Sequence, residues 1–251
     1  MAAETDPSDP FKGMKWINAP KRSKWDITDG RLKLSVPSET DLWRGTKFGF
    51  TKENAPYYFK KITGDFQVTC HIKGKFDNLY DQGGILIQAS KTVYLKCGIE
   101  YFKDQCYAST CVTKDNSDWS LMPLPDKAKQ AWFVIKRIGD CVQVYSSQDG
   151  VIYNQVRLAV LTEEPILKVG LFGACPQGTG FKIYFEHFSI EEESGEGEEE
   201  DWGEDEEGGE YEDEGEYEEG EEGEYEEEGG EEGGEDEGQM LDDEEEEEDI
   251  E

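Results

Sequence analysis

Residues 80–120 read YDQGGILIQASKTVYLKCGIEYFKDQCYASTCVTKDNSDWS and contain the most regular pattern in the chain. Apolar side chains alternate with polar or small ones over residues 84–90 and 93–101, and a third run of this kind covers 106–113. An alternation of period two is typical of half-buried β-strands, because successive side chains of a strand point to opposite faces. A turn at residues 103–105 then predicts an antiparallel hairpin between the second and third runs.

The strand predicted over residues 93–101 has one apolar face and one face with polar chemistry. The polar face carries Lys96 and Glu100. Charged side chains are rarely buried, so a sheet that only packs does not require them there. We therefore expect this face to be the functional surface, beside a loop that holds Asp118 and Trp119.

The same hairpin decides the environment of two cysteines. If the turn places Cys97 opposite Cys111, the two thiols are close enough for a cross-strand disulfide. The chain has six cysteines without the CxxC spacing of metal sites, and most of them lie in apolar strands. Free thiols in a reducing compartment are therefore the main expectation, with the Cys97–Cys111 pair as the exception to check.

Short alternating runs separated by Gly, Pro or Asp turns continue on both sides of this stretch. Clear hairpin signals occur at Thr28-Asp29-Gly30 and at Gly139-Asp140. No segment keeps a helical period, and there is no repeat of fixed length. Roughly a dozen short strands with frequent turns predict an all-β sandwich or barrel.

The net charge of −35 averages two unlike segments. Residues 191–251 hold 39 of the 60 acids and no Lys or Arg, which leaves 21 acids and 25 bases in the other 190 residues. Repulsion between like charges and a high glycine content oppose folding of the acidic segment. We expect a flexible N-terminus over residues 1–10, one domain over 11–190, and a disordered Glu/Gly-rich tail over 191–251.

Composition also limits the location and the partners. No apolar run approaches the roughly 18 residues of a membrane span, and the opening MAAETDPSDP lacks a signal-peptide pattern, so we expect a cytoplasmic protein, with the nucleus as the alternative. The absence of metal-ligand spacing and of a Gly-rich phosphate loop before a helix predicts no cofactor. The acidic tail favours basic protein partners over nucleic acid or membranes, with its tyrosines as contact points.

Seven motifs point to a known family. They are WINAP at 16–20, TDLWR at 40–44, YDQGG at 80–84, KCGIEY at 96–101, SDWS at 117–120, RIGD at 137–140 and GLFGACP at 170–176. On these motifs residues 11–190 resemble the regulation-of-enolase family, within the concanavalin A-like lectin/glucanase superfamily. The resemblance implies a jelly-roll sandwich of two curved antiparallel sheets with a concave face, the shape that lectins and glucanases use for glycans. That family has no settled chemistry, and its name reflects a link to enolase regulation and sugar metabolism.

Catalysis on a glycan would need two carboxyl groups, about 5–5.5 Å apart for retention or 6.5–9.5 Å apart for inversion. The related glucanases place acids at two-residue steps on one strand, whereas Glu100 has Gly98 and Phe102 at those steps. Asp81 or Asp118 would have to approach Glu100 from another segment. Glu100 is therefore a weak catalytic candidate, and an enzyme is not the leading hypothesis.

Binding of a polyol needs hydrogen-bonding groups beside aromatic rings that cover the apolar side of a sugar. The predicted ligand-binding residues are Trp43, Arg44, Asp81, Gln82, Lys96, Glu100, Asp118 and Trp119. A purely structural role is the alternative for some of them. Asp41 and Arg44 would then form an ion pair at a sheet edge, and Asp118 would pin its loop to the sheet.

Three functional hypotheses follow. The first is a non-catalytic binding or regulatory sandwich for a carbohydrate-like ligand or a partner protein, such as a metabolic enzyme. The second is a glycan-active hydrolase that uses Glu100. The third places the function in the acidic tail, which is similar to tubulin C-terminal tails and to the tails of histone chaperones, and would capture basic proteins.

Overall fold

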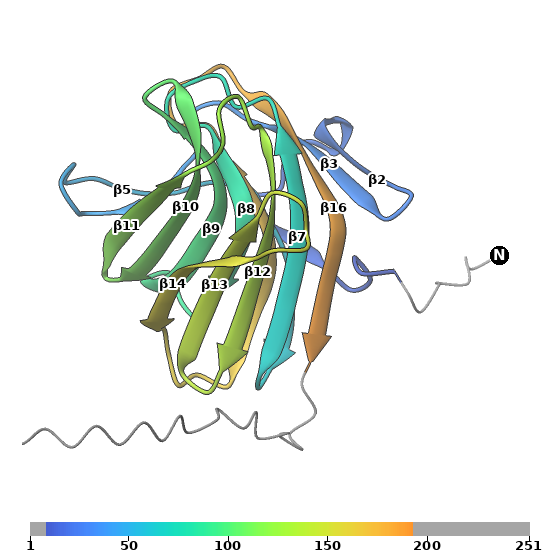
Figure 1. The fold of residues 1–251 in the computed structure, drawn as a ribbon, viewed down its shortest axis with the longest axis vertical. Helices are drawn as coiled ribbons and strands as arrows, with labels where there is room; N and C mark the ends of the chain where they lie inside the picture. The colour runs from blue at the N-terminus through green and yellow to red at the C-terminus, as the bar shows by residue number, and fades with distance from the viewer. Residues whose placement is uncertain (1–8, 193–251) are drawn as a thin grey trace, which may run out of the picture. The chain divides into compact units, whose positions relative to one another are not determined.

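The computed structural model describes residues 9–192, which form sixteen β-strands and one short 3₁₀ turn, η1 (Arg22–Lys24). Two antiparallel sheets of seven strands face each other, so the predicted β-sandwich is confirmed (Figure 1). The first sheet has the order β1 (Lys15–Ile17), β6 (Tyr57–Thr63), β15 (Ile166–Ala174), β8 (Gln82–Gln88), β9 (Val93–Phe102), β10 (Gln105–Lys114), β11 (Asn116–Pro123). The second sheet has the order β14 (Asn154–Val160), β13 (Cys141–Ser147), β12 (Gln130–Ile138), β7 (Phe66–Gly74), β16 (Phe181–Glu192), β3 (Arg31–Val36), β2 (Trp25–Thr28).

The main core lies between the two sheets. Strand β9 shows how the sequence builds it, because Leu95, Cys97 and Ile99 alternate along the strand and are at most 1% exposed. Strand β7 does the same from the second sheet with Val68 and Ile72. The period-two pattern of the sequence therefore predicted the inner faces correctly.

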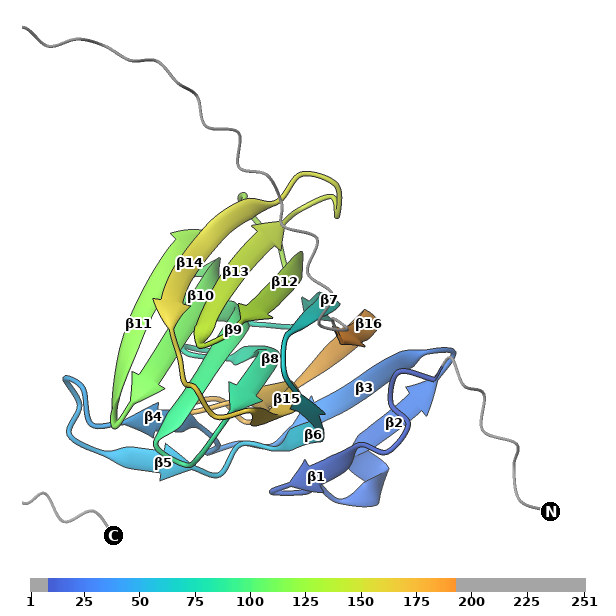
Figure 2. The ribbon, with the colours of Figure 1, turned by 90° about the horizontal axis from the view of Figure 1, so that it is seen from below.

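A small hairpin covers part of the outer face of the first sheet. It consists of β4 (Leu42–Arg44) and β5 (Thr51–Glu53), which form a separate two-stranded sheet. The first sheet curves around this hairpin (Figure 2). Leu42 of the hairpin packs against Leu86 and Tyr94 in a second apolar cluster. Consequently the outer face of the first sheet is also partly removed from water.

The β9–β10 turn corrects the predicted register. Only Lys103 and Asp104 form the turn, both with positive φ, as two-residue hairpin turns of type I′ require. Cys97 therefore lies opposite Thr110, whereas Cys111 lies opposite Lys96. A shift of one residue moves a side chain to the other face of the sheet, so the two thiols are on opposite faces and the suggested cross-strand pairing is wrong. All six cysteines are free.

Two boundaries differ from the predicted ones. The segment around Asp118 is not a loop, because it belongs to strand β11, which pairs with β10 along its length. Strand β16 continues two residues past the predicted domain end at Ile190. Of the predicted flexible N-terminus over residues 1–10 and the predicted disordered tail over residues 191–251, residues 1–8 and 193–251 lie outside the described residues.

Candidate functional site

A cavity of about 550 Å³ lies between the outer face of the first sheet and the β4–β5 hairpin. Its walls combine aromatic rings with hydrogen-bonding side chains. The lining residues are Asp41, Trp43, Phe48, Phe50, Thr51, Lys52, Tyr80, Gln82, Lys96, Glu100, Trp119, Pro176 and Gln177. The cavity thus opens on the polar face that the sequence singled out.

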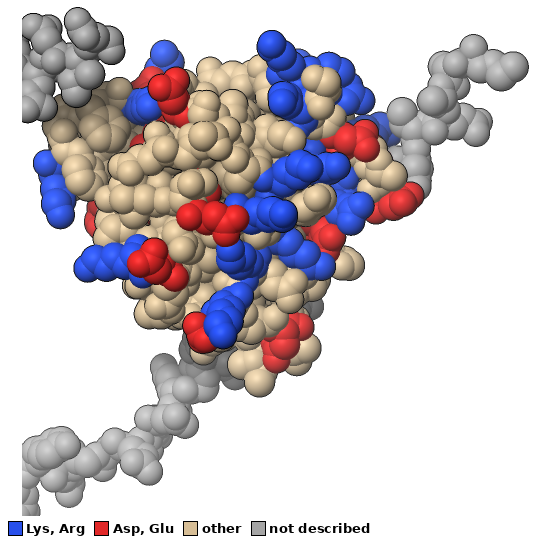
Figure 3. All heavy atoms as spheres, turned by 90° about the horizontal axis from the view of Figure 1, so that it is seen from above, with Lys and Arg blue, Asp and Glu red and all other residues tan. Residues whose placement is uncertain are grey.

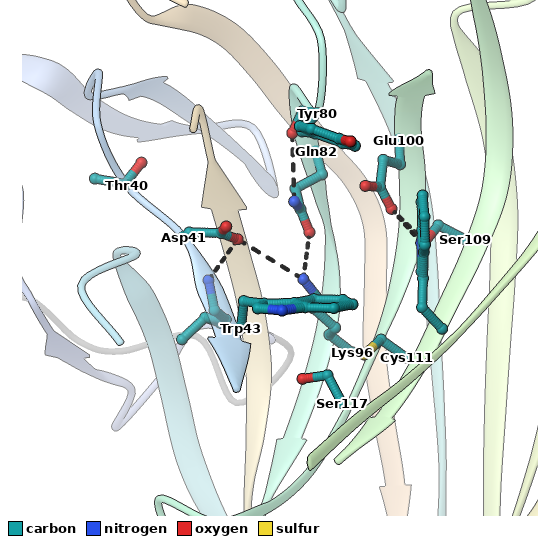
Figure 4. Close-up of polar contacts among 12 residues, drawn as sticks. Thr40, Asp41, Trp43, Tyr80, Gln82, Lys96, Glu100, Ser109, Cys111 and Ser117 are labelled. Atoms are coloured by element: carbon teal, nitrogen blue, oxygen red, sulfur yellow. Dashed lines mark hydrogen bonds and ion pairs between the residues drawn. The ribbon is translucent and has the colours of Figure 1, made fainter. Parts of the chain in front are cut away.

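Lys96 forms the centre of the polar floor (Figure 4). Its Nζ donates a hydrogen bond to Gln82 Oε1 at 2.7 Å and lies 3.9 Å from Asp41 Oδ1. Gln82 donates through Nε2 to the carbonyl of Tyr80 at 3.3 Å, which fixes the orientation of its amide. Lys96 is only 3% exposed, so it is a buried cation held by one carboxylate and one amide oxygen.

Glu100 forms the second polar element of the floor. Its Oε2 accepts hydrogen bonds from Ser109 Oγ at 2.5 Å and from Trp119 Nε1 at 3.0 Å. The indole N–H of Trp119 is also 3.1 Å from Ser109 Oγ, so the three groups form one network. No described residue donates to Glu100 Oε1, which leaves an acceptor for a guest in the cavity.

Glycines shape the floor between these two charges. Lys96 and Glu100 are four residues apart on the same face of β9, and Gly98 lies between them beside Gly84 of β8. The two strands are so close here that a Cβ on Gly98 would lie 2.2 Å from the Gly83 carbonyl oxygen. Only glycine therefore fits at this pair, and neither glycine lines the cavity itself.

The electrostatics of the floor follow from burial. Burial raises the pKa of Glu100, and the positive charge of Lys96 offsets only part of this effect. Burial acts on Lys96 in the opposite direction, but the surrounding negative charges, Asp41 foremost, outweigh it and raise the pKa of Lys96. Lys96 is therefore protonated at neutral pH, while the ionised form of Glu100 is disfavoured.

Aromatic rings surround this polar floor. Trp43 lies edge-on to Trp119 with ring centroids 6.2 Å apart, and it packs against Phe48 at 5.7 Å. Tyr80 completes the wall at 6.3 Å from Trp119 and 6.5 Å from Phe48. Phe48 and its neighbour Phe50 are both 44% exposed, so the mouth of the cavity is apolar.

Five of the eight predicted ligand-binding residues line this cavity. They are Trp43, Gln82, Lys96, Glu100 and Trp119. The remaining three, Arg44, Asp81 and Asp118, have other contacts.

Arg44 connects the hairpin to the rest of the sheet. Its guanidinium pairs with Glu53 and donates to the carbonyl of Asp115 at 3.2 Å. The predicted Asp41–Arg44 ion pair is therefore wrong, because Asp41 faces Lys96 and Arg44 faces Glu53. Arg44 positions β4 and does not line the cavity.

Asp81 and Asp118 lie away from the cavity for different reasons. Asp81 is fully buried, and its Oδ2 accepts hydrogen bonds from the backbone N–H groups of Asp77 and Asn78, so it fixes the turn that carries Tyr80. Asp118 alternates with Trp119 along β11 and points to the other face, where it pairs with Arg157 at 2.6 Å. Neither carboxylate is part of the cavity wall beside Glu100.

Asp41 is the main residue of the site that sequence reasoning placed wrongly. It comes two residues before Trp43, the spacing that puts two side chains on one face of an extended segment. That spacing was the available signal. The contributions of Phe48, Phe50 and Gln177 come from loops whose positions depend on the tertiary fold, so no local pattern indicated them.

Within residues 9–192 no group of three or more His, Cys, Asp or Glu side chains is arranged to hold a metal ion. In the same part of the chain, no helix has the length and apolar character to cross a membrane.

Comparison with known proteins defines the family. Residues 16–193 match the family DUF1349, described as a protein of unknown function, and the chain belongs to this family. The chain is 27% identical over 175 residues to Regulation of enolase protein 1 of Saccharomyces cerevisiae, covering 70% of this chain and 87% of that protein. It is 29% identical over 177 residues to the uncharacterized protein AN7484 of Emericella nidulans, covering 66% and 87%. The predicted resemblance to the regulation-of-enolase family is thus confirmed.

Solved structures agree with the fold. A functionally unknown protein from Saccharomyces cerevisiae superposes with a TM-score of 0.70 at 26% identity, over 74% of this chain and 99% of that chain. The GH43 protein BlXynB from Bacillus licheniformis superposes with a TM-score of 0.61 at 14% identity, over 75% of this chain and 40% of that one. At such low identity the second likeness concerns only the fold, which is the predicted concanavalin A-like sandwich.

Proposed function

We propose that this chain is a non-catalytic binding protein whose outer-face cavity takes a neutral, polyhydroxylated, carbohydrate-like ligand. The observation that carries this proposal is the convergence of Lys96, Glu100 and Gln82 on the floor of a cavity walled by aromatic rings. A small number of polar side chains placed among aromatic rings is typical of small-molecule sites, where the polar groups fix the orientation of the ligand.

The chemistry of the cavity fits a sugar better than an ion. The positive charge of Lys96 is balanced by the nearby Asp41, so the floor has little net charge to attract a free ion. Glu100 Oε1 can accept a hydrogen bond from a hydroxyl group, and Trp43 and Trp119 can cover the apolar face of a ring. A volume of about 550 Å³ lies within the roughly 300–1,000 Å³ of typical small-ligand sites.

Isothermal titration with xylose, glucose and their β-linked and α-linked trisaccharides tests the proposal. We expect at least one of these sugars to bind, and Glu100→Gln and Trp43→Phe to weaken binding by about tenfold, equivalent to about 1.4 kcal/mol. Glu164→Gln and Trp132→Phe make the same chemical changes outside the cavity and should leave binding unchanged. Equal affinity in all four variants, or no binding across the panel, would reject a carbohydrate site.

A hydrolase remains the second candidate because two carboxyl groups, Asp41 and Glu100, line the same cavity. Burial raises the pKa of Glu100, as a general acid requires. Incubation of the same trisaccharides with the wild-type chain, Asp41→Asn and Glu100→Gln distinguishes the two candidates. Cleavage by the wild type that both variants lose would replace the binding proposal with a catalytic one.

A protein partner is the remaining part of the proposed role. The name of the yeast relative suggests that the domain would associate with a metabolic enzyme. Residues 191–251 would attract basic proteins through their 39 carboxylates. Association through the acidic segment should fall steeply with salt, since the screening length is about 8 Å at physiological ionic strength. Pull-downs with the full chain at low and high salt, with and without residues 193–251, test this part separately from the sugar site.

A further inference from the structure

A second groove, with a volume of about 620 Å³, lies on the outer side of the second sheet. Five of its lining residues are basic and one, Glu186, is acidic. The basic residues are Arg31, Lys73, Lys75, Lys127 and Lys129. Lys and Arg side chains gather on one face of the molecule (Figure 3). This groove is separate from the aromatic cavity, which opens on the other sheet and shares no lining residue with it.

Backbone hydrogen bonds bring these lysines together from three segments. The N–H of Gly74 donates to the carbonyl of Lys129 at 3.1 Å, and the N–H of Lys75 donates to the carbonyl of Lys182 at 3.0 Å. The end of β7 is thereby fixed between the segment before β12 and the start of β16. The backbone positions of Lys75 and Lys129 are consequently fixed next to each other by the sheet.

Nearby acids neutralise only part of this charge. Glu186 pairs with Lys73 at 2.8 Å and with Arg31 at 3.5 Å, so one carboxylate serves two cations. Lys129 pairs with Asp77. Lys127 is 3.8 Å from Asp126, but both side chains are 90% exposed, where such a pair contributes little.

Lys75 makes no ion pair with any described residue. Like charges held together without counter-charges repel one another and lower stability. A groove that keeps an excess of cations therefore favours an anion as its occupant.

We propose that this groove binds a small, multiply charged anion of the polyphosphate or phosphate-ester class. Arg31 supplies a planar guanidinium that lies 5.5 Å from the ring of Tyr184 and is held beside Glu186, while Lys75 and Lys127 supply mobile point charges at the rim. Lysine and arginine are the residues that recognise phosphate groups. Gln130 and Gln148 add neutral donors to the wall.

Size and overall charge favour a small anion over a nucleic acid. A groove of about 620 Å³ is in the range of small-ligand sites. The chain as a whole carries a net charge of −35, which repels a long polyanion at a distance. A short anion can instead respond to the local positive field of the groove.

Isothermal titration of the full chain with sodium tripolyphosphate tests binding of a free polyphosphate. Sedimentation with vesicles that contain phosphatidylinositol phosphates tests whether a lipid headgroup supplies the phosphate groups. The double variant Lys75→Gln/Lys127→Gln removes two exposed charges from the rim. The control Lys103→Gln/Lys114→Gln removes two exposed charges outside the groove. We expect the groove variant to lower affinity by about tenfold or more and the control to stay within about twofold.

Binding of tripolyphosphate or of the vesicles that is lost only in the groove variant would support the site and identify the source of the phosphate. Equal affinity in the groove and control variants would overturn the proposal, because any surface charge would then suffice. Absence of binding to both probes, or binding of duplex DNA alone, would overturn it as well. Trisaccharide binding in the aromatic cavity should be unchanged by the groove variant, so the two proposals fail independently.

Discussion

The two faces of strand β9 have the same burial but opposite chemistry. On the inner face, Leu95 and Ile99 pack into the core between the sheets. On the outer face, Lys96 and Glu100 are 3% and 4% exposed, although the hairpin that covers them leaves a cavity. Apolar burial stabilises the fold, whereas burial of charges costs free energy unless partners compensate for it. The outer face of β9 is therefore organised for something other than packing.

The largest expected effect comes from removing the cation of the outer face. Lys96→Met leaves the buried carboxylate of Asp41 without its counter-charge, and should destabilise the fold by about 3–5 kcal/mol in urea unfolding, as breaking a buried pair does. The added change Asp41→Asn should recover part of this loss, since it removes the unpaired charge. A loss below about 1 kcal/mol in Lys96→Met would mean that the two faces differ less than proposed.

The inner face supplies the matched counterpart. Ile99→Val deletes one methylene from a fully buried side chain and should cost about 0.5–1.5 kcal/mol. Because Ile99 does not line the aromatic cavity, the affinity for a sugar ligand should not change. Loss of binding in this variant would show that the inner packing controls the outer site.

The pH dependence of stability should separate the faces further. The folded-state pKa of Glu100 is raised by burial, so the folded chain holds this proton more tightly than the unfolded chain. That contribution is complete below the ordinary value of 4.5 and is lost as pH rises through the folded pKa. The melting temperature of Glu100→Gln relative to wild type should therefore increase from pH 4 toward neutrality. A difference that is constant over this range would contradict the buried, disfavoured carboxylate.

The smallest expected effect concerns the thiols on the two faces. Cys97 belongs to the inner face and Cys111 to the outer face, and burial raises the pKa of the first thiol beyond the ordinary range and also raises that of the second. Mild oxidation should therefore produce no Cys97–Cys111 disulfide and no shift in melting temperature. Mass spectrometry of peptides digested without reduction checks this, and a linked pair would contradict the register of the hairpin.

The alternation of apolar and polar residues along the strands predicted those features of the fold and site that depend only on which face a side chain occupies. The sandwich, the inner face of β9, and the position of Lys96 and Glu100 on one face all depend on alternation alone. Local pattern could not predict where a turn has two residues in place of three, and that single residue decided the partner of Cys97.

The site was predictable only where it lies on a strand that the sequence revealed. Asp118 was placed on the functional side because β11 was read as a loop, and alternation within a strand points it away from Trp119. The sequence predicted Asp81 as a ligand-binding residue. In the structure its Oδ2 instead accepts hydrogen bonds from backbone N–H groups. Convergence of Asp41 with Lys96 depends on how the hairpin packs on the sheet, which no short motif specifies.

The most direct test of the outer cavity uses the indole N–H signals of the tryptophans in a ¹H–¹⁵N NMR titration with the tightest-binding trisaccharide of the panel. Trp119 Nε1 donates to Glu100 and the ring of Trp43 faces the same cavity, whereas Trp132 packs against His71 and His187 on the second sheet. We predict that the Trp43 and Trp119 signals shift in proportion to bound ligand while the Trp132 signal stays in place. Shifts confined to Trp132, or no change at Trp43 and Trp119 under saturating ligand, would contradict a binding site on the outer face of the first sheet.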